Sequence, residues 1–187
     1  MPKVLVVLLL VFATLGPSTA EAQARNWDIN RPHTGSRPFQ LDIHGGFTWW
    51  GFGAATGIRF GIPIVNNGFI DSLNNAVYLN FGADFYWLER RCRGGGGGCD
   101  YGAGFGFPIT LHWEFYLNDD WSLFAEIGGQ FFLHPEWWDN GRFDWRQPGL
   151  WFVWTLGASW HINDWFLLTL RVGSPYIAFG ITFQFGG

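Results

Sequence analysis

The 187-residue sequence predicts an all-β fold, an eight-stranded antiparallel up-and-down β-barrel that follows an N-terminal signal peptide. First, apolar residues recur at every second position in eight segments, which is the side-chain period of a β-strand. Second, beyond the first two dozen residues no apolar run approaches the about 18 residues that a membrane helix needs. Third, an even number of strands lets an antiparallel sheet close, so that no strand edge stays unpaired.

The start of the chain has the pattern of a secretory signal peptide. Lys3 gives a basic beginning, residues 4–15 are almost wholly apolar, and the small residues around Ala22 and Ala24 fit signal-peptidase cleavage after either position. A retained anchor is the alternative, but a spanning helix takes about 20 apolar residues and this run is shorter. We therefore expect a signal peptide over residues 1–22, a periplasmic segment over 23–36 and the barrel over 37–187.

The first predicted strand shows the alternation clearly. Between Phe39 and Trp49 every second residue is apolar or glycine, and Gln40, Asp42 and His44 lie between them. Such a ribbon has one apolar and one polar face. The same pattern predicts strands over residues 39–49, 57–64, 77–87, 106–115, 121–131, 150–161, 166–173 and 177–185.

The connections between these strands differ in length, and this predicts their direction. Residues 118–120 and 163–164 read as tight turns, whereas residues 88–100 and 134–148 are long, polar and irregular. Short turns face the periplasm in membrane barrels and long loops face outward. The ten residues 66–75 fit this scheme poorly, because they must also be a periplasmic turn.

Composition predicts that the apolar faces point outward into lipid. Charged residues make up only 14% of the chain, aromatic residues make up 20%, and the only lysine is Lys3. The charged fraction of soluble domains is about 25%, so the polar faces here suit a packed barrel interior better than a surface in water. A soluble barrel with the apolar face inside is the alternative. Aromatic residues near predicted strand ends, as in a membrane-interface girdle, are Trp49, Trp50, Trp87, Tyr101, Trp121, Trp151, Trp165 and Tyr176.

The polar faces place charged side chains in the lumen, where they must pair because an isolated buried ion is very costly. Four carboxylates face two arginines, so some acids must be protonated, hydrated or close to a protonated histidine. Eight strands leave an interior just wide enough for side chains, so we expect a closed charge network. The alternative is a narrow path for ions, protons or a small solute. The predicted network is Asp42, Arg59, Asp84, His112, Glu114, Glu126 and Arg171, and His44, Gln130 and His161 share its face.

The C-terminal strand carries a resemblance to a known signal. The run Gly180-Ile181-Thr182-Phe183-Gln184-Phe185 resembles the Gly-x-x-Φ-x-Φ assembly signal of outer-membrane barrels, with Gly180, Phe183 and Phe185 at its defined positions. It departs from that signal at Ala178, where a polar residue is usual, and in the two glycines that follow Phe185. The layout of the whole chain is similar to that of the small eight-stranded outer-membrane proteins of the OmpA-transmembrane-domain and OmpX type. The resemblance implies a Gram-negative outer membrane, and the barrel-assembly machinery as partner during insertion.

Two cysteines flank a glycine-rich run in one predicted outward loop. Cys92 and Cys99 are separated by six residues, mostly glycine, and two cysteines in one segment of an exported chain predict a disulfide. A metal site would need more ligands than this segment offers. We expect neither a metal nor a cofactor.

The predicted loop His134–Gln147 is rich in aromatic and basic residues, which are typical of binding hot spots. It suggests an extracellular partner, although the same residues would also suit the bilayer interface. The formal net charge of −4 gives no indication of nucleic-acid binding. The candidate binding residues are Trp137, Trp138, Arg142, Phe143, Trp145 and Arg146.

The sequence predicts a structural or surface-interaction role rather than an enzyme. A lipid-modifying activity would need a nucleophile, a base and an orienting acid, and Ser159, His161 and Glu126 are the candidates. Their expected place is inside the barrel near its periplasmic end, away from the outer leaflet. The narrow channel and the lipid-modifying enzyme remain the alternative functions.

Overall fold

A computed structural model describes residues 27–48, 53–92, 99–139 and 142–186. Within these ranges, the side chains of residues 88–92, 99–102, 134–139 and 142–148 lie outside the description. The predicted signal peptide, with its cleavage positions Ala22 and Ala24, also lies outside the described residues.

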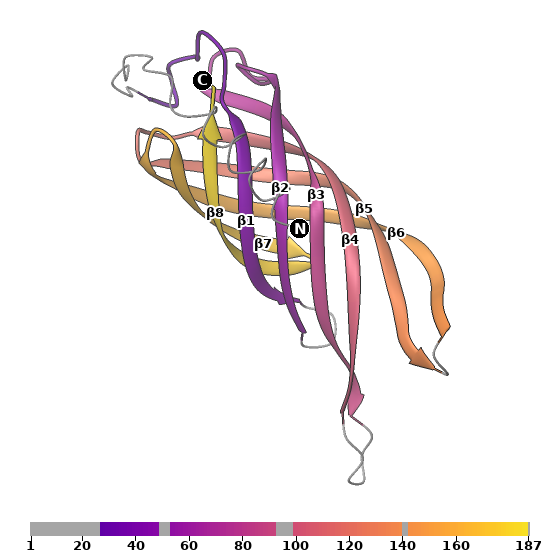
Figure 1. Cartoon of the computed structure of the whole chain (residues 1–187). Helices are drawn as coiled ribbons and strands as arrows, with labels where there is room; N and C mark the ends of the chain where they lie inside the picture. The colour runs from indigo at the N-terminus through magenta and orange to yellow at the C-terminus, as the bar shows by residue number, and fades with distance from the viewer. Residues whose placement is uncertain (1–26, 49–52, 93–98, 140–141, 187) are drawn as a thin grey trace, which may run out of the picture.

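The described residues form a closed antiparallel barrel in which each strand pairs with its neighbours in the sequence (Figure 1). This confirms the predicted eight-stranded meander. In the part of the chain that the structure describes, no helix is long and apolar enough to cross a membrane. The strands are β1 (Phe39–Thr48), β2 (Gly53–Val65), β3 (Asn75–Cys92), β4 (Cys99–Tyr116), β5 (Trp121–Asp139), β6 (Arg142–Asn163), β7 (Phe166–Ser174) and β8 (Tyr176–Phe185).

The barrel closes between its first and last strands. Phe39 pairs with Phe185 at one end and Thr48 pairs with Tyr176 at the other, so all ten residues of β1 have partners on β8. Because closure gives these backbone groups hydrogen-bonding partners, it removes the open edge that a sheet would otherwise present.

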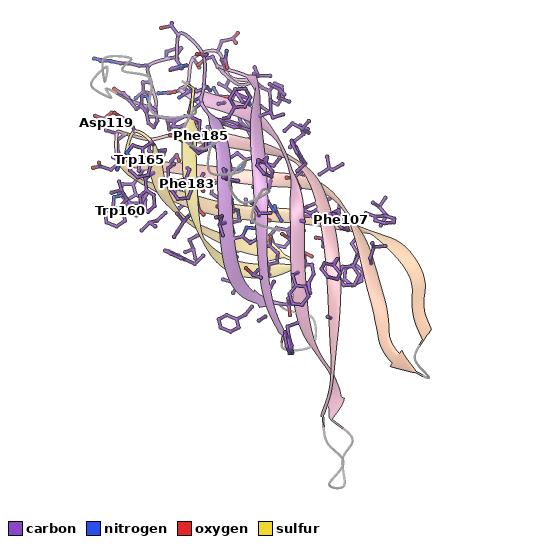
Figure 2. The ribbon with its side chains drawn as sticks, viewed as in Figure 1. Phe107, Asp119, Trp160, Trp165, Phe183 and Phe185 are labelled. Atoms are coloured by element: carbon purple, nitrogen blue, oxygen red, sulfur yellow. The ribbon has the colours of Figure 1, made fainter. Side chains whose placement is uncertain are left out.

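The barrel is polar inside and apolar outside. On β1, Asp42 and His44 are each 3% exposed, whereas Ile43 between them is 50% exposed. The largest exposed fractions among apolar side chains are the 81% of Leu150 and the 76% of Phe47. Polar and apolar residues that alternate in the sequence therefore alternate between the lumen and the exterior, and the apolar residues lie on the exterior (Figure 2).

The connections β2–β3, β4–β5 and β6–β7 lie at one end of the barrel, which we call the turn end, whereas the single-residue connection between β7 and β8, Pro175, lies at the other end. The side chain of Asn118 accepts hydrogen bonds from the backbone N–H groups of Asp120 and Trp121, both at 2.9 Å, and Asn163 accepts one from Trp165 at 3.1 Å. Asparagine favours such local turns because its side chain can hydrogen-bond the backbone two or three residues on. Residues 66–74 connect β2 to β3 at this end too, as predicted.

At the opposite end, which we call the hairpin end, the described parts of the two predicted irregular loops are β-strands, over residues 88–92, 99–100, 134–139 and 142–148. For these residues the prediction of irregular loops is wrong. Leu88 pairs with Gly102, and Glu136 pairs with Asp144. Past Trp87 on β3 the partner strand β2 has ended, and β6 pairs with β7 only as far as Trp154. The chain therefore continues as two hairpins that project beyond the barrel (Figure 1).

The physical reason for this error lies in the surroundings of the hairpins. Within the barrel wall a strand has one face in the lumen and one on the exterior, so its sequence alternates. Beyond the wall both faces of a two-stranded hairpin have similar surroundings, and the cross-strand hydrogen bonds persist without any alternation to reveal them.

Candidate functional site in the barrel lumen

The structure brings the seven predicted network residues together inside the barrel. They come from β1, β2, β3, β4, β5 and β7, and they meet because each occupies an inward position of its strand. All seven are buried: Asp42, Arg59, Asp84, His112, Glu114, Glu126 and Arg171.

Asp42 on β1 is held from three strands at once. Its Oδ1 accepts hydrogen bonds from Nη1 of Arg171 and from Nδ1 of His44, both at 2.8 Å. Its Oδ2 accepts from the hydroxyls of Thr182 at 2.8 Å and Thr169 at 3.1 Å. Both oxygens of this buried carboxylate are satisfied, and one of the contacts is an ion pair with an arginine.

His44 bridges two carboxylates. Its Nδ1 faces Asp42, and its Nε2 lies 3.1 Å from Oδ1 of Asp84 on β3. The same Nε2 also lies 2.9 Å from the hydroxyl of Tyr176 on β8. An ionised carboxylate can only accept, and the protonated imidazole is the form that offers an N–H group to both carboxylates.

Arg59 on β2 joins the two sides of the lumen. Its Nη1 donates to Oε2 of Glu126 at 3.1 Å, and its Nη2 donates to Oδ2 of Asp84 at 3.2 Å. The same Nη2 donates to the hydroxyl of Tyr176 at 2.5 Å, and that hydroxyl donates onward to Asp84 at 3.2 Å. One guanidinium thus pairs with carboxylates from β3 and β5.

Tyr176 corrects one part of the predicted aromatic girdle, because its side chain is 2% exposed and points into the lumen. Its position could have been recognised: along β8 it falls on the same face as Ala178, Gly180 and Thr182, which are all buried. Tyr176 lies near a strand end in the sequence, but it is an even number of residues away from the inward positions of β8, and its side chain is therefore inside. Of the other girdle residues, Trp87, Trp121, Trp151 and Trp165 are exposed, and Trp49, Trp50 and Tyr101 lie outside the described side chains.

A second histidine occupies an equivalent place nearer the turn end. Nδ1 of His112 on β4 lies 2.9 Å from Oε1 of Glu126, and its Nε2 lies 3.6 Å from Oε2 of Glu114. The ring stacks on Phe124 at a centroid distance of 4.5 Å. Asn80 also donates to Oε1 of Glu126 at 3.1 Å. His112, like His44, therefore lies between two carboxylates.

These contacts account for the predicted excess of acid. The four buried carboxylates face two arginines, and His44 and His112 each stand between two of the carboxylates. With both histidines protonated, the positive and negative charges of this buried set balance. Buried charges that balance and are hydrogen-bonded avoid the large penalty of an unpaired ion.

A third group of polar residues lies closest to the turn end. The hydroxyl of Ser122 donates to Oε1 of Glu114 at 2.6 Å, and Nε2 of His161 lies 2.9 Å from the same hydroxyl. Glu114 also accepts from the hydroxyl of Tyr116 at 3.0 Å and from Gln40 at 3.1 Å. If the Ser122 hydroxyl donates to Glu114, Nε2 of His161 is the donor to Ser122. We call Glu114, Ser122 and His161 the turn-end cluster.

The residues considered for lipid-modifying chemistry are not arranged for it. Ser159 shares the inward face of β6 with His161, but His161 contacts Ser122, and Glu126 contacts His112 instead. In the turn-end cluster the serine lies between acid and imidazole, and its hydroxyl is within hydrogen-bond distance of both. Ser122 carries no sequence signal beyond its inward position on β5. Among the described residues, no group of three or more His, Cys, Asp or Glu side chains has a geometry that could hold a metal ion.

The predicted assembly signal occupies both faces of β8. Gly180 points into the lumen, where an added Cβ would lie 2.4 Å from Oγ1 of Thr169 and 2.6 Å from Oδ2 of Asp42. Phe183 and Phe185 point outward, and Phe183 stacks on Trp165 at 6.1 Å (Figure 2). The absence of a side chain at Gly180 therefore leaves the space that the Asp42 contacts occupy.

The candidate binding residues and cysteines lie on the two projecting hairpins. The binding residues Trp137 and Trp138 are on β5, and Arg142, Phe143, Trp145 and Arg146 are on β6. They belong to strands rather than to a loop, and their side chains lie outside the described part. Cys92 and Cys99 are direct partners in the register of β3 and β4. Their sulfur atoms are not described, and the disulfide stays a prediction.

Taken together, these features define a closed eight-stranded antiparallel barrel with an apolar exterior and a lumen filled by paired charges. Neither the family models nor the curated proteins compared with this chain give a match.

Proposed function

We propose that the protein is an integral β-barrel of a Gram-negative outer membrane, with a lumen closed by its charge network and a structural or surface-interaction role. The observation that carries this proposal is the inverted distribution of side chains. Charged residues are buried inside, and large apolar residues cover the exterior of every strand.

The exterior is hard to reconcile with water as the only solvent. Exposed apolar patches on soluble monomers are usually limited to a few hundred Å², whereas this exterior is apolar around the barrel. Lipid, by contrast, requires such a surface and tolerates strands only in a closed barrel. Exposed apolar side chains along the wall include Ile43, Phe60, Ile109, Leu123, Ile127, Phe152, Leu156 and Phe179.

Aromatic side chains at the turn end support one membrane interface. Trp121 and Trp160 stack outside the barrel at 6.0 Å, with an interplanar angle of 11°. Trp165 and Phe183 stack beside β8 with an angle of 13°, and Figure 2 shows Trp160, Trp165 and Phe183 on the exterior near this end. Tryptophan is enriched at this depth because its ring is apolar and its N–H is polar.

The height of the wall agrees with a bilayer. The shortest strand, β7, has nine residues, and β1 and β8 have ten each. Ten residues that rise about 3.3 Å each, at a tilt of about 40°, cover roughly 25 Å, which is the height of the apolar band in such barrels.

The two hairpins are the parts most suited to meet a partner. With the turn end in the periplasm, they extend beyond the outer surface of the membrane. The β5–β6 hairpin carries the aromatic and basic residues of the predicted binding segment, among them Trp137 and Arg146. Replacing residues 134–148 by a short turn should leave the barrel folded and abolish any binding to cells or surfaces.

The location is tested by isolating the protein from membranes and comparing its behaviour with and without detergent. We expect a detergent-dependent monodisperse protein that migrates differently on gels before and after boiling, because a closed barrel resists the denaturing detergent until it is heated. A mature protein that stays monodisperse in plain buffer would overturn the proposal.

A further inference from the structure

The segment before β1 does not simply lead into the barrel but lies across its turn end. The backbone N–H of Trp27 donates to Oδ1 of Asp119, in the β4–β5 turn, at 2.5 Å. Asp28 forms an isolated antiparallel bridge with Asn118 in the same turn. The start of the segment, at Trp27 and Asp28, is therefore fixed to a connection about 90 positions further along the chain.

The side chain of Trp27 packs directly against the turn-end cluster. Its ring meets Tyr116 edge to face at 4.6 Å and His161 at 5.0 Å. Behind it, Tyr78, Tyr116 and Ser122 have no solvent exposure at all. The indole thus shields this end of the lumen from water.

Arg37 anchors the other end of the segment. Its Nε donates to the carbonyl of Asn66 at 3.1 Å, its Nη2 donates to the side chain of Asn74, and its guanidinium lies 3.9 Å from the ring centre of Tyr116. The side chain is 2% exposed. A buried cation stacked on a tyrosine ring closes the space beside Trp27.

These contacts also explain why the connection between β2 and β3 is so long for its end of the barrel. The backbone N–H of Asn74 donates to the carbonyl of Ile29 at 2.8 Å, and Asn67 accepts from the backbone N–H of His33 at 2.8 Å. Burial, together with the nearby charge of Arg37, lowers the pKa of His33. A two-residue turn would offer none of these partners.

We propose that residues 27–38 form a plug, seated on residues 66–74 and on the β4–β5 turn, that controls access of water and small solutes to the turn-end cluster. When the plug is displaced, Glu114, Ser122 and His161 face solvent. Deeper in the lumen, the contacts of Arg59 and Arg171 with Glu126 and Asp42 stay in place. Plug opening therefore exposes a polar chamber at one end and does not by itself create a continuous pore. This inference rests on the lumen geometry and holds whether or not the barrel lies in a membrane.

The test is the rate at which a small, charged thiol reagent modifies Ser122→Cys in the folded full-length barrel. The native cysteines are removed as Cys92→Ser and Cys99→Ser so that only one thiol reacts. We expect Trp27→Ala to raise the modification rate at least tenfold. Trp160→Ala, which removes an outward tryptophan at the same end, should leave the rate unchanged. Equal rates with and without Trp27 would overturn the proposal.

A second reporter separates plug opening from general loosening of the barrel. Thr155 on β6 is buried beside Glu126, deeper than the turn-end cluster, so Thr155→Cys should stay slow in the Trp27→Ala background. If both reporters accelerate together, the barrel has loosened and the plug proposal fails. If Trp27→Ala does not fold, Asp119→Ala replaces it in the test, because this change removes the hydrogen bond to the Trp27 backbone and leaves the lumen residues intact. Asp119→Ala should raise the modification rate of Ser122→Cys and leave that of Thr155→Cys unchanged.

Discussion

At the scale of single residues, Arg59 is a buried cation whose charge is compensated by two buried carboxylates. Its guanidinium pairs with Asp84 and Glu126 at 3.2 and 3.1 Å, and all three side chains are buried. Removing one partner of a buried ion pair costs more than the pair itself contributes, because the remaining charge is left without compensation.

We therefore expect Arg59→Ala to lower the free energy of unfolding by about 3–5 kcal/mol. Denaturant unfolding in detergent micelles, followed by tryptophan fluorescence, measures the change. Arg31→Ala is the matched control because Arg31 is exposed, and its effect should stay within about 0.5 kcal/mol. A loss of similar size in both variants would show that the charge network does not stabilise the barrel.

Gly180 allows a test of why a glycine begins the C-terminal motif. An added methyl group would collide with Thr169 and Asp42 inside the lumen, so Gly180→Ala should destabilise the folded barrel by about 1–3 kcal/mol. Gly45→Ala on β1 is the control, since the nearest atom to its added Cβ is the Ala55 carbonyl oxygen at 3.8 Å.

The measurement is unfolding of the purified, refolded protein, which needs no assembly machinery. A Gly180→Ala barrel as stable as the wild type, but poorly inserted in cells, would assign the glycine to recognition instead of to space in the lumen.

At the scale of strands and hairpins, the sequence was informative where a strand has two different surroundings. The alternation around Asp42 and His44 predicts the strand and its two faces, and the low fraction of charged residues predicts that the polar face is the buried one. The same holds for the polar residues of β4 and β5. The pattern also predicts which residues face the lumen, because side chains alternate between the two faces of each strand.

The individual partners could not be predicted in the same way. His44 meets Asp84 and Tyr176 because three strands have a particular register and the barrel closes, which are long-range properties. Ser122 looks like any small inward residue until its contacts are known. The sequence did not predict the projecting hairpins because their strands lack alternation. The dipeptide Asn140-Gly141 is typical of tight hairpins and could have indicated the β5–β6 hairpin.

The register of the first hairpin makes the predicted disulfide specific. Cys92 and Cys99 are cross-strand partners, so a bond between them would join positions that the backbone already holds together. We expect the protein isolated without reductant to resist alkylation at both cysteines and to have a mass lower by two hydrogens than the reduced protein.

Because the bond would close a ring of only a few residues, its contribution to stability should be about 2–3 kcal/mol at most, and Cys92→Ser with Cys99→Ser should still fold. Rapid alkylation of both thiols in the oxidised preparation would contradict the pairing.

At the scale of the whole molecule, the charge network and the N-terminal plug close the lumen independently. The network fills the middle of the barrel with paired side chains from six strands. The plug covers the turn end with Trp27 and Arg37. An eight-stranded barrel offers little space beyond its side chains, so neither element needs to be large to stop diffusion.

This double closure distinguishes a closed barrel from a narrow channel. We expect the purified protein in planar lipid bilayers to give a flat current trace across a range of voltages. Trp27→Ala should remain non-conducting, because Arg59 and Arg171 still bind Glu126 and Asp42 behind the plug. Only the combination of Trp27→Ala with Arg59→Ala removes closure at both levels, and it should be the first variant to show discrete current steps. Steps of defined size from the wild-type protein would instead identify the lumen as an ion path and make the charge network its selectivity region.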